Sequence, residues 1–257
     1  MSKNLDERAY IVTGGSKGFG LAIAECLIRE GARVGLIGRN AESLEEAVAM
    51  LGMDHAYATV MDVSTRDDIA SAFEQVRQHF GRLDGLVNNA GIAKPGAMGE
   101  LIESEVVQQV STNFMGTVFA CQAALPLIED SDNPRLVNIS SASAEHHDEM
   151  AHLSIYAASK AAVERFSRDL RREIQDRGIG VTILRPGAAM TEFAADWDTE
   201  RMRRAINAWH ERGPGMDTGM QPFHVGDAVA YCLGCPPGVS IDLLEIRPNT
   251  RVPKVAL

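Results

Sequence analysis

A regular alternation of short apolar runs and longer segments with helical periodicity constrains the fold of this chain more than any other feature. Seven runs of five to seven residues, several rich in Val and Ile, are typical of strands buried on both faces. Parallel strands need crossover connections, and the helical segments between the runs supply them. We therefore predict an α/β fold, a Rossmann-type doubly wound parallel sheet of about seven strands with helices on both faces. The expected strands are residues 9–13, 33–38, 55–61, 83–88, 135–140, 179–185 and 242–246.

One long segment, from residue 188 to about residue 223, lies outside this alternation. No linker, low-complexity stretch or internal repeat divides the sequence, so residues 1–257 are expected to form one domain. A long segment after a strand end is typical of a lid or substrate loop. A pair of surface helices with no role in binding is the alternative.

Charge and hydropathy exclude several classes of function. The net charge of −10 argues against nucleic-acid binding, which needs a basic face. No apolar run reaches bilayer length and the first eight residues are polar, so we expect a cytoplasmic protein without membrane contact. Cys232 and Cys235 form a C-x-x-C without a second ligand pair at zinc spacing, and Cys26 and Cys121 lie in predicted helices. Neither a metal site nor a disulfide framework is therefore predicted.

A glycine-rich turn at residues 13–20 lies between the first predicted strand and the first predicted helix. Glycines let the backbone turn sharply and let a pyrophosphate approach, while the helix offers free N–H groups and its positive dipole end. Its position in a strand–turn–helix unit favours dinucleotide binding over a glycine turn that binds nothing. The predicted contacts are Gly14, Ser16, Lys17, Gly18, Phe19 and Gly20.

The end of the second predicted strand indicates which nicotinamide cofactor is bound. An NAD site needs a carboxylate there for the ribose 2′-hydroxyl, whereas this strand ends in Gly38-Arg39. The Arg39 guanidinium can bind a 2′-phosphate in a bidentate manner, and Lys17 adds a second positive charge. Two cations without a carboxylate predict NADP(H). A solvated Arg39 at the start of a helix is the alternative.

Tyr156 and Lys160 form a Y-x-x-x-K pair near the start of a predicted helix, so their side chains share one face. A tyrosine, with an ordinary pKa of about 10, is a poor acid or base near neutral pH. A lysine ammonium one turn away lowers that pKa by favouring the phenolate. Tyr156 is therefore a candidate proton donor for carbonyl reduction, or acceptor for alcohol oxidation.

Together with five further motifs, these features resemble the short-chain dehydrogenase/reductase family along nearly the whole chain. The further motifs are Asp62-Val63, Asn88-Asn89-Ala90-Gly91, Asn113, Asn138-Ile139-Ser140-Ser141, and Pro186-Gly187 with Thr191. The resemblance implies that Tyr156 is the general acid/base and that Lys160 lowers its pKa and binds the nicotinamide ribose. It implies that Ser141 orients the substrate oxygen and that Asn113 holds a relay water near Lys160.

The same resemblance implies further cofactor contacts at the carboxyl ends of strands, where open parallel sheets bind ligands. Asp62 and Val63 are similar to the adenine contacts, and Asn88 and Ala90 match the turn beside the cofactor. The residues that match the segment around the nicotinamide amide are Pro186, Gly187, Ala189 and Thr191.

The serine position departs from the family pattern. Ser141 lies fifteen residues before Tyr156, which is longer than the family's usual spacing, and Ser143 sits at the usual distance. We favour Ser141 because it closes the strand end. The extra residues then belong to the polar loop 144–149. For that loop we consider a solvated loop, a contact of His146 or His147 with substrate, and a metal site from His146, His147, Asp148 or Glu149.

The predicted function is an NADP(H)-dependent oxidoreductase that transfers a hydride between nicotinamide and a small alcohol or carbonyl substrate. The alternatives are an epimerase or dehydratase of the same fold, and a non-catalytic NADP-binding regulator or scaffold. The resemblance also implies a homo-oligomer, a dimer or tetramer, in which the helices carrying Asn113 and Tyr156 pack against a second copy. The sequence does not name the substrate.

Overall fold

The computed structural model describes residues 5–146, 151–189, 191–194, 196–212, 216–218 and 220–252, and its centre is a seven-stranded sheet. The strand order is β3-β2-β1-β4-β5-β6-β8, and all neighbouring strands are parallel. The predicted α/β fold is confirmed, with strand ends that differ from the expected ones by at most two residues. The strands are β1 (Ala9–Thr13), β2 (Arg33–Gly38), β3 (Ala56–Val60), β4 (Gly85–Asn88), β5 (Arg135–Ile139), β6 (Gly180–Pro186) and β8 (Leu243–Ile246).

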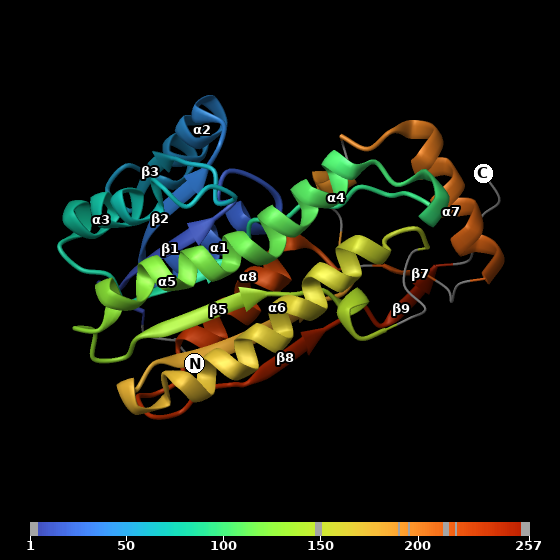
Figure 1. The fold of residues 1–257 in the computed structure, drawn as a ribbon. Helices are drawn as coiled ribbons and strands as arrows, with labels where there is room; N and C mark the ends of the chain where they lie inside the picture. Colours follow the sequence, from blue (N-terminus) through green and yellow to red (C-terminus); the bar gives the residue numbers. More distant parts are fainter. Residues whose placement is uncertain are drawn as a thin grey trace.

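Helices cover both faces of this sheet (Figure 1). Successive strand residues point to opposite faces, so Ile11 packs in one hydrophobic core and Val12 in the other. The layer over Val12 consists of α1 (Gly18–Arg29), α2 (Ala41–Leu51) and α8 (Pro222–Leu233). The layer over Ile11 consists of α3 (Ile69–Phe80), α5 (Gly116–Ile128) and α6 (Ser154–Glu173), and α4 (Glu103–Val110) leads into α5 through the π-helical turn η2 (Ser111–Met115).

The segment between β6 and α8 is more regular than a loop. It contains the short turn η5 (Glu192–Ala194), the helix α7 (Thr199–Arg212) and the strand β7 (Met216–Thr218). β7 pairs antiparallel with β9 (Thr250–Val252), a two-stranded sheet that the sequence analysis did not predict. The remaining short turns are η1 (Met98–Glu100), η3 (Ala142–Ala144) and η4 (Gln175–Arg177). Among the described residues, no helix has both the length and the apolar composition needed to cross a bilayer.

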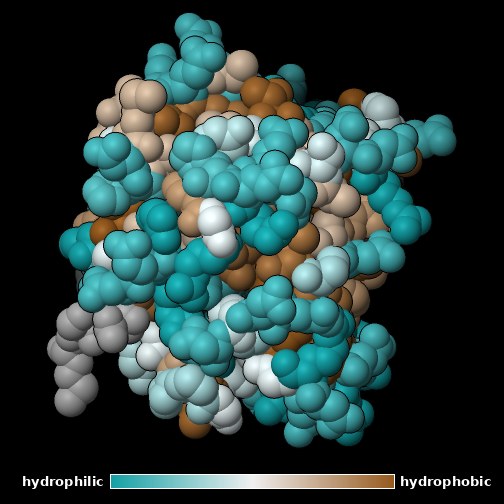
Figure 2. Space-filling model, turned by 90° about the vertical axis from the view of Figure 1, so that its left-hand side faces the viewer, coloured by the Kyte–Doolittle hydropathy of each residue, from teal (hydrophilic) through white to brown (hydrophobic). Residues whose placement is uncertain are grey.

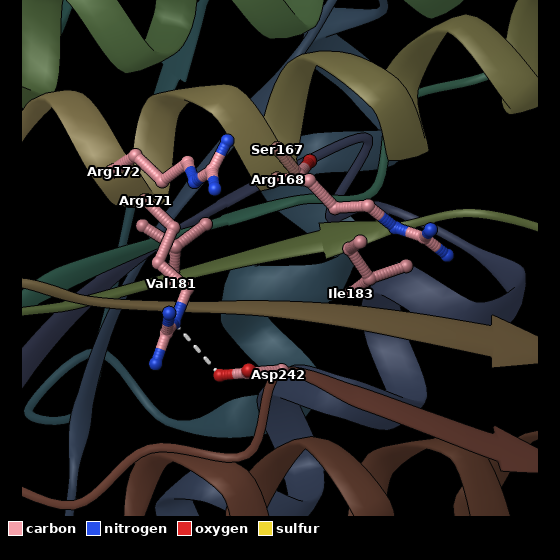
Figure 3. A pocket seen from close by; sticks show the side chains of 7 residues that line it. All are labelled: Ser167, Arg168, Arg171, Arg172, Val181, Ile183 and Asp242. Atoms are coloured by element: carbon pink, nitrogen blue, oxygen red, sulfur yellow. Dashed lines mark ion pairs between the residues drawn. The ribbon is translucent and has the colours of Figure 1, made fainter.

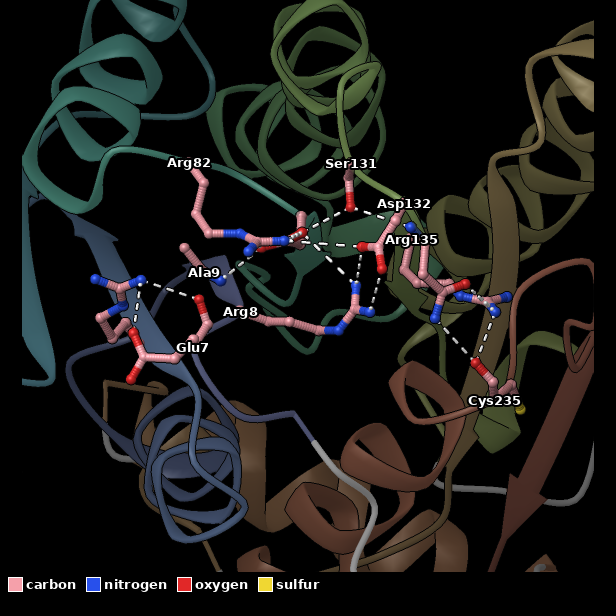
Figure 4. A network of polar contacts seen from close by, with 11 residues as sticks. Glu7, Arg8, Ala9, Arg82, Ser131, Asp132, Arg135 and Cys235 are labelled. Carbon is pink, nitrogen blue, oxygen red and sulfur yellow. Dashed lines mark hydrogen bonds and ion pairs between the residues drawn. The ribbon is translucent and has the colours of Figure 1, made fainter.

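Parallel strands present all their carboxyl ends at one edge of the sheet, where Figure 1 shows α4 and α7. Charged side chains, among them Arg8, Arg82 and Asp132, close the opposite edge (Figure 4). The buried Asp84 accepts hydrogen bonds from Ala9 N (2.8 Å), the Ser131 hydroxyl (2.6 Å) and the Arg82 guanidinium (2.6 and 2.7 Å). Although burial raises the pKa of Asp84, these hydrogen bonds hold it below its ordinary value. The molecule seen from that side is mostly hydrophilic (Figure 2). This network stabilises the fold, and the candidate site lies at the carboxyl edge.

Candidate functional site

Tyr156 and Lys160 lie one turn apart in α6, where the helix passes the carboxyl end of β5. The Lys160 side chain is buried, and its Nζ donates a hydrogen bond of 2.8 Å to the Ile139 carbonyl. Burial disfavours the charged form and lowers the pKa of Lys160 to about 8. Lys160 therefore holds its charge at a fixed position, with a pKa close to the physiological range.

Asn113 is fully buried in η2 and faces α6. Its Nδ2 donates to the Ile92 carbonyl and to the Ser159 hydroxyl, both at 2.9 Å, and its Oδ1 accepts from Ile92 N at 2.8 Å. The main-chain carbonyl of Asn113 accepts from the Thr117 hydroxyl at 2.9 Å. The Asn113 side chain thus ties the turn after β4 to α6 beside Lys160.

The serine at the end of β5 meets the tyrosine. Ser141 forms a hydrogen bond with Tyr156, and the Ser143 hydroxyl donates to the Ser141 hydroxyl at 2.9 Å. Burial raises the pKa of Tyr156 above its ordinary value, and the Ser141 hydrogen bond acts in the opposite direction. The protein alone therefore does not lower the pKa of Tyr156 as its spacing from Lys160 predicted. Burial dominates, and the Lys160 ammonium is bonded to Ile139.

A buried ionic network behind these residues joins α6 to β6. Glu164 accepts two hydrogen bonds from the Arg185 guanidinium (2.6 and 2.8 Å) and one from the Ser140 hydroxyl (2.7 Å). The Glu164 and Arg185 side chains are 7% and 6% exposed. Since Ser140 precedes Ser141, this network fixes the strand end that carries the candidate catalytic serine. Sequence analysis missed it, although an arginine within an apolar strand was an available signal.

The loop after Ser141 extends the same network to β8. The His146 Nε2 lies 2.7 Å from Glu245, and the other oxygen of Glu245 accepts from Arg185 at 2.8 Å. His146 thus contacts the protein's own carboxylate. The other residues considered for a metal site there, His147, Asp148 and Glu149, lie outside the described residues. Within the described part of the chain, no three His, Cys, Asp or Glu side chains group to hold a metal ion.

The glycine turn leads β1 into α1 and leaves the helix N-terminus open. Gly14 and Gly18 have φ angles of +64° and +55°, in the left-handed region that favours glycine. A Cβ on Gly20 would lie 1.9 Å from the Gly14 carbonyl oxygen, so a side chain there would displace the turn. Lys17 precedes α1 and makes no side-chain capping bond. The first-turn N–H groups can therefore receive an anion.

Asn89, which was not among the predicted contacts, locks this turn. Its Nδ2 donates to the carbonyls of Thr13 (3.0 Å) and Gly14 (3.2 Å). The Thr13 hydroxyl oxygen in turn accepts from the backbone N–H groups of Asn89 (3.0 Å) and Ala90 (3.1 Å). By contrast, the Asn88 side chain is buried and donates to Asn138 Oδ1 at 2.8 Å. Asn88 therefore joins β4 to β5 with its side chain.

Arg39, after β2, lies beside Asp62, after β3. The closest nitrogen and oxygen are 3.8 Å apart, and the Arg39 side chain is 55% exposed. Asp62 is held in place because its Oδ1 accepts from the backbone N–H (2.9 Å) and hydroxyl (2.8 Å) of Ser64. β2 itself ends without a carboxylate, but the neighbouring strand places one next to Arg39. The loose ion pair leaves the exposed guanidinium able to bind a phosphate.

A cavity of about 360 Å³ lies between the glycine turn and the segment after β6. The segment is anchored at its start, where Gly187 N donates to the Ile246 carbonyl at 2.8 Å. Ala189 packs on the sheet's core. The lining residues are Lys17, Gly18, Leu21, Ala22, Glu25, Thr191 and Pro222. At the end of the cavity next to the glycine turn, the open helix end, Lys17 and Gly18 fit the phosphates of a dinucleotide, whereas Glu25 lies further along α1.

A second, smaller cavity of about 200 Å³ between α6, β6 and β8 contains none of the predicted site residues (Figure 3). Three arginines, Arg168, Arg171 and Arg172, line it. Arg171 Nε forms an ion pair with Asp242 at 2.7 Å, and the Ser167 hydroxyl donates to the Val163 carbonyl at 2.7 Å. Arg171, Asp242 and Ser167 are thus engaged with other groups of the protein. Because none of the predicted site residues lines this cavity, it is separate from the candidate site.

Comparisons with known proteins agree with this architecture. A family model described as short chain dehydrogenase matches residues 8–202. A human 3-oxoacyl-[acyl-carrier-protein] reductase is 32% identical over 200 residues, which are 78% of this chain and 83% of that protein. The structure of a dehydrogenase/reductase from Sinorhizobium meliloti 1021 is similar at a TM-score of 0.82 and 30% identity, over 96% of both chains. The closed form of serine dehydrogenase complexed with NADP+ is similar at a TM-score of 0.80 and 28% identity, over 93% of this chain and 94% of that one.

Proposed function

Because the chain belongs to the short-chain dehydrogenase family, we propose that it is an NADP(H)-dependent oxidoreductase acting on a small alcohol or carbonyl compound. When bound, the nicotinamide supplies or accepts the hydride at the substrate carbon. One observation carries the proposal: Tyr156, Ser141 and Lys160 meet at the carboxyl end of β5, beside Asn113.

In this proposal, side chains and backbone groups of the protein transfer the proton and position the substrate oxygen. The Tyr156 phenol donates it to the substrate oxygen in carbonyl reduction, or accepts it in alcohol oxidation. The Ser141 hydroxyl, hydrogen-bonded to Tyr156, orients the same oxygen. Lys160 places a positive charge that favours the phenolate once the substrate excludes water. The main-chain carbonyl of Asn113, which accepts from the Thr117 hydroxyl, would also bind the relay water.

The proposal includes a set of cofactor contacts, which the open glycine turn supports. Gly14, Ser16, Gly18, Phe19 and Gly20 would hold the pyrophosphate with Lys17, and Arg39 would bind the 2′-phosphate. Asp62 and Val63 would contact the adenine, and Asn88 and Ala90 would border the cofactor with their backbone. The residues proposed around the nicotinamide amide are Pro186, Gly187, Ala189 and Thr191.

Fluorescence titration with NADPH and NADH tests the cofactor choice, on wild type, Arg39→Ala and the control Arg165→Ala, an exposed arginine of α6. We expect wild type to prefer NADPH, and Arg39→Ala to weaken NADPH about 10-fold with little change for NADH, because a charge-assisted contact is lost. Wild-type preference for NADH, or equal loss of both cofactors in Arg39→Ala, would contradict the proposal. Binding without any Tyr156-dependent turnover would favour the regulator or scaffold.

We also propose a cellular compartment and an oligomeric state for the protein. The four cysteines are free thiols, and three of them are buried, as is usual in a reducing compartment. We place the protein in the cytoplasm as a homo-oligomer, a dimer or tetramer, without nucleic-acid or membrane partners.

A further inference from the structure

A small hydrophobic cluster beside Tyr156 is separate from the two cores that cover the sheet. Ala93, Leu153 and Trp197 are buried in it, and Tyr156 packs against it. The Phe193 ring extends this wall: its centroid lies 5.6 Å from that of Tyr156 and 6.2 Å from that of Trp197. Although Phe193 lies beside the candidate acid/base, it is 40% exposed. The exposed Phe193 ring therefore offers an apolar surface to a ligand that binds at the Tyr156 hydroxyl.

Two cations next to this wall, Lys94 and Arg201, are paired with carboxylates of the protein. Lys94, which follows Ala93, forms an ion pair of 2.6 Å with Asp196, which precedes Trp197. Arg201, close to Trp197 in the sequence, forms an ion pair of 2.8 Å with Glu105 of α4. Lys94 and Arg201 have side chains that are only 16% and 14% exposed. A substrate carboxylate or phosphate would therefore compete with Asp196 or Glu105 for these two cations.

We propose that the site takes an uncharged ketone, or the corresponding secondary alcohol, with an aromatic ring next to the reacting carbon. Phe193 and Trp197 bind the ring, because aromatic pairs prefer tilted and edge-to-face contacts like those that already link Tyr156, Phe193 and Trp197. In reduction, the carbonyl carbon gains a hydride from NADPH and the oxygen gains a proton, which yields the alcohol and NADP+. This inference rests on the proposed function.

Three methyl ketones test the substrate class through NADPH oxidation: acetophenone, which carries a phenyl ring, acetoacetate, which carries a carboxylate, and butanone, which carries neither. We expect acetophenone to exceed acetoacetate in kcat/KM by about 100-fold, since Lys94 and Arg201 beside the aromatic wall are already paired with carboxylates. Phe193→Ala should lower the ratio of acetophenone to butanone by about 10-fold, mainly through KM. The control Tyr231→Ala, an exposed aromatic residue on α8, should leave that ratio unchanged.

Binding can be measured without turnover because the chain has two tryptophans, Trp197 and Trp209. In Trp209→Phe, the emission of Trp197 should be quenched saturably by acetophenone in the presence of NADP+. Adding Phe193→Ala should weaken that binding about 10-fold, and acetoacetate should not compete.

The outcomes separate the two proposals. Tyr156-dependent turnover that favours acetoacetate, or an unchanged ratio in Phe193→Ala, overturns the aromatic substrate and leaves the oxidoreductase standing. Absence of Tyr156-dependent turnover with any of the three ketones counts against the proposed function. In that case the saturable quenching still decides whether the wall binds an aromatic ring.

Discussion

Among single residues, Lys160 carries a positive charge that we propose to act on Tyr156, and burying this charge reduces the stability of the fold. Lys160 is 4% exposed, and its ammonium donates a hydrogen bond to the Ile139 carbonyl. The pKa of about 8 means that the folded protein releases this proton more readily than the unfolded chain, whose lysine pKa is about 10.4. Holding the charge in the folded state therefore reduces stability, as expected where position matters more than stability.

The pH dependence of stability tests this cost. Between pH 8 and about pH 10.4 the unfolded chain binds more protons at this position, so the contribution of Lys160 to the free energy of unfolding rises with pH. Below pH 8 the penalty is constant. The free-energy difference between wild type and Lys160→Met, measured by denaturant unfolding, should shift in favour of wild type by roughly 2 kcal/mol from pH 7 to pH 9.5. A difference that does not change with pH would contradict the lowered pKa.

At the scale of elements, the turn between β1 and α1 depends on close backbone approach. Gly20 lies in the first turn of α1, directly against the Gly14 carbonyl. Asn89, which follows β4, donates a hydrogen bond to the same carbonyl. The turn is therefore shaped by three segments, and its geometry leaves no space for a methyl group at position 20.

Gly20→Ala should lower the free energy of unfolding by about 3 kcal/mol, since backbone must move to admit the Cβ. NADPH binding should weaken at least about 10-fold, because the displaced turn no longer fits the pyrophosphate. Denaturant unfolding and fluorescence titration measure the two effects. Gly99→Ala is the matched control, since a Cβ at Gly99 meets nothing within 4 Å. Equal behaviour of the two variants would show that the close approach is not required.

At the scale of the whole molecule, α4 and η2 present apolar residues to the surface. The large exposed side chains there include Val107, Val110 and Met115. These residues lie on the helix that carries Asn113, which we expect to pack against a second copy. The apolar side chains of this helix are thus directed partly to the surface.

Val110→Glu should convert the expected dimer or tetramer into a smaller species, because a carboxylate in a closely packed apolar interface is costly. Size-exclusion chromatography with light scattering gives the mass directly. Met53→Glu, at an exposed methionine outside this stripe, should leave the mass unchanged. A wild-type monomer, or an oligomer indifferent to Val110→Glu, would place the interface elsewhere or remove it.

Local sequence pattern was enough to predict several features of this protein. Apolar runs separated by helical periodicity placed all seven parallel strands, because each run must be buried on both faces. The glycine turn and the pairing of Tyr156 with Lys160 could also be predicted from the sequence, because each lies within one turn or one helix.

Tertiary structure decided what depends on residues far apart in the chain. Glu164 and Arg185 are paired because α6 packs on β6, and Asp62 reaches Arg39 because β3 pairs with β2. Phe193 meets Tyr156 only through the path of the segment after β6. The raised pKa of Tyr156 follows from its surroundings, where burial outweighs the charge that spacing alone suggested. Sequence periodicity indicates which side of a helix or strand is buried. The partners of a side chain and the loss of its hydration are set only when the elements pack together.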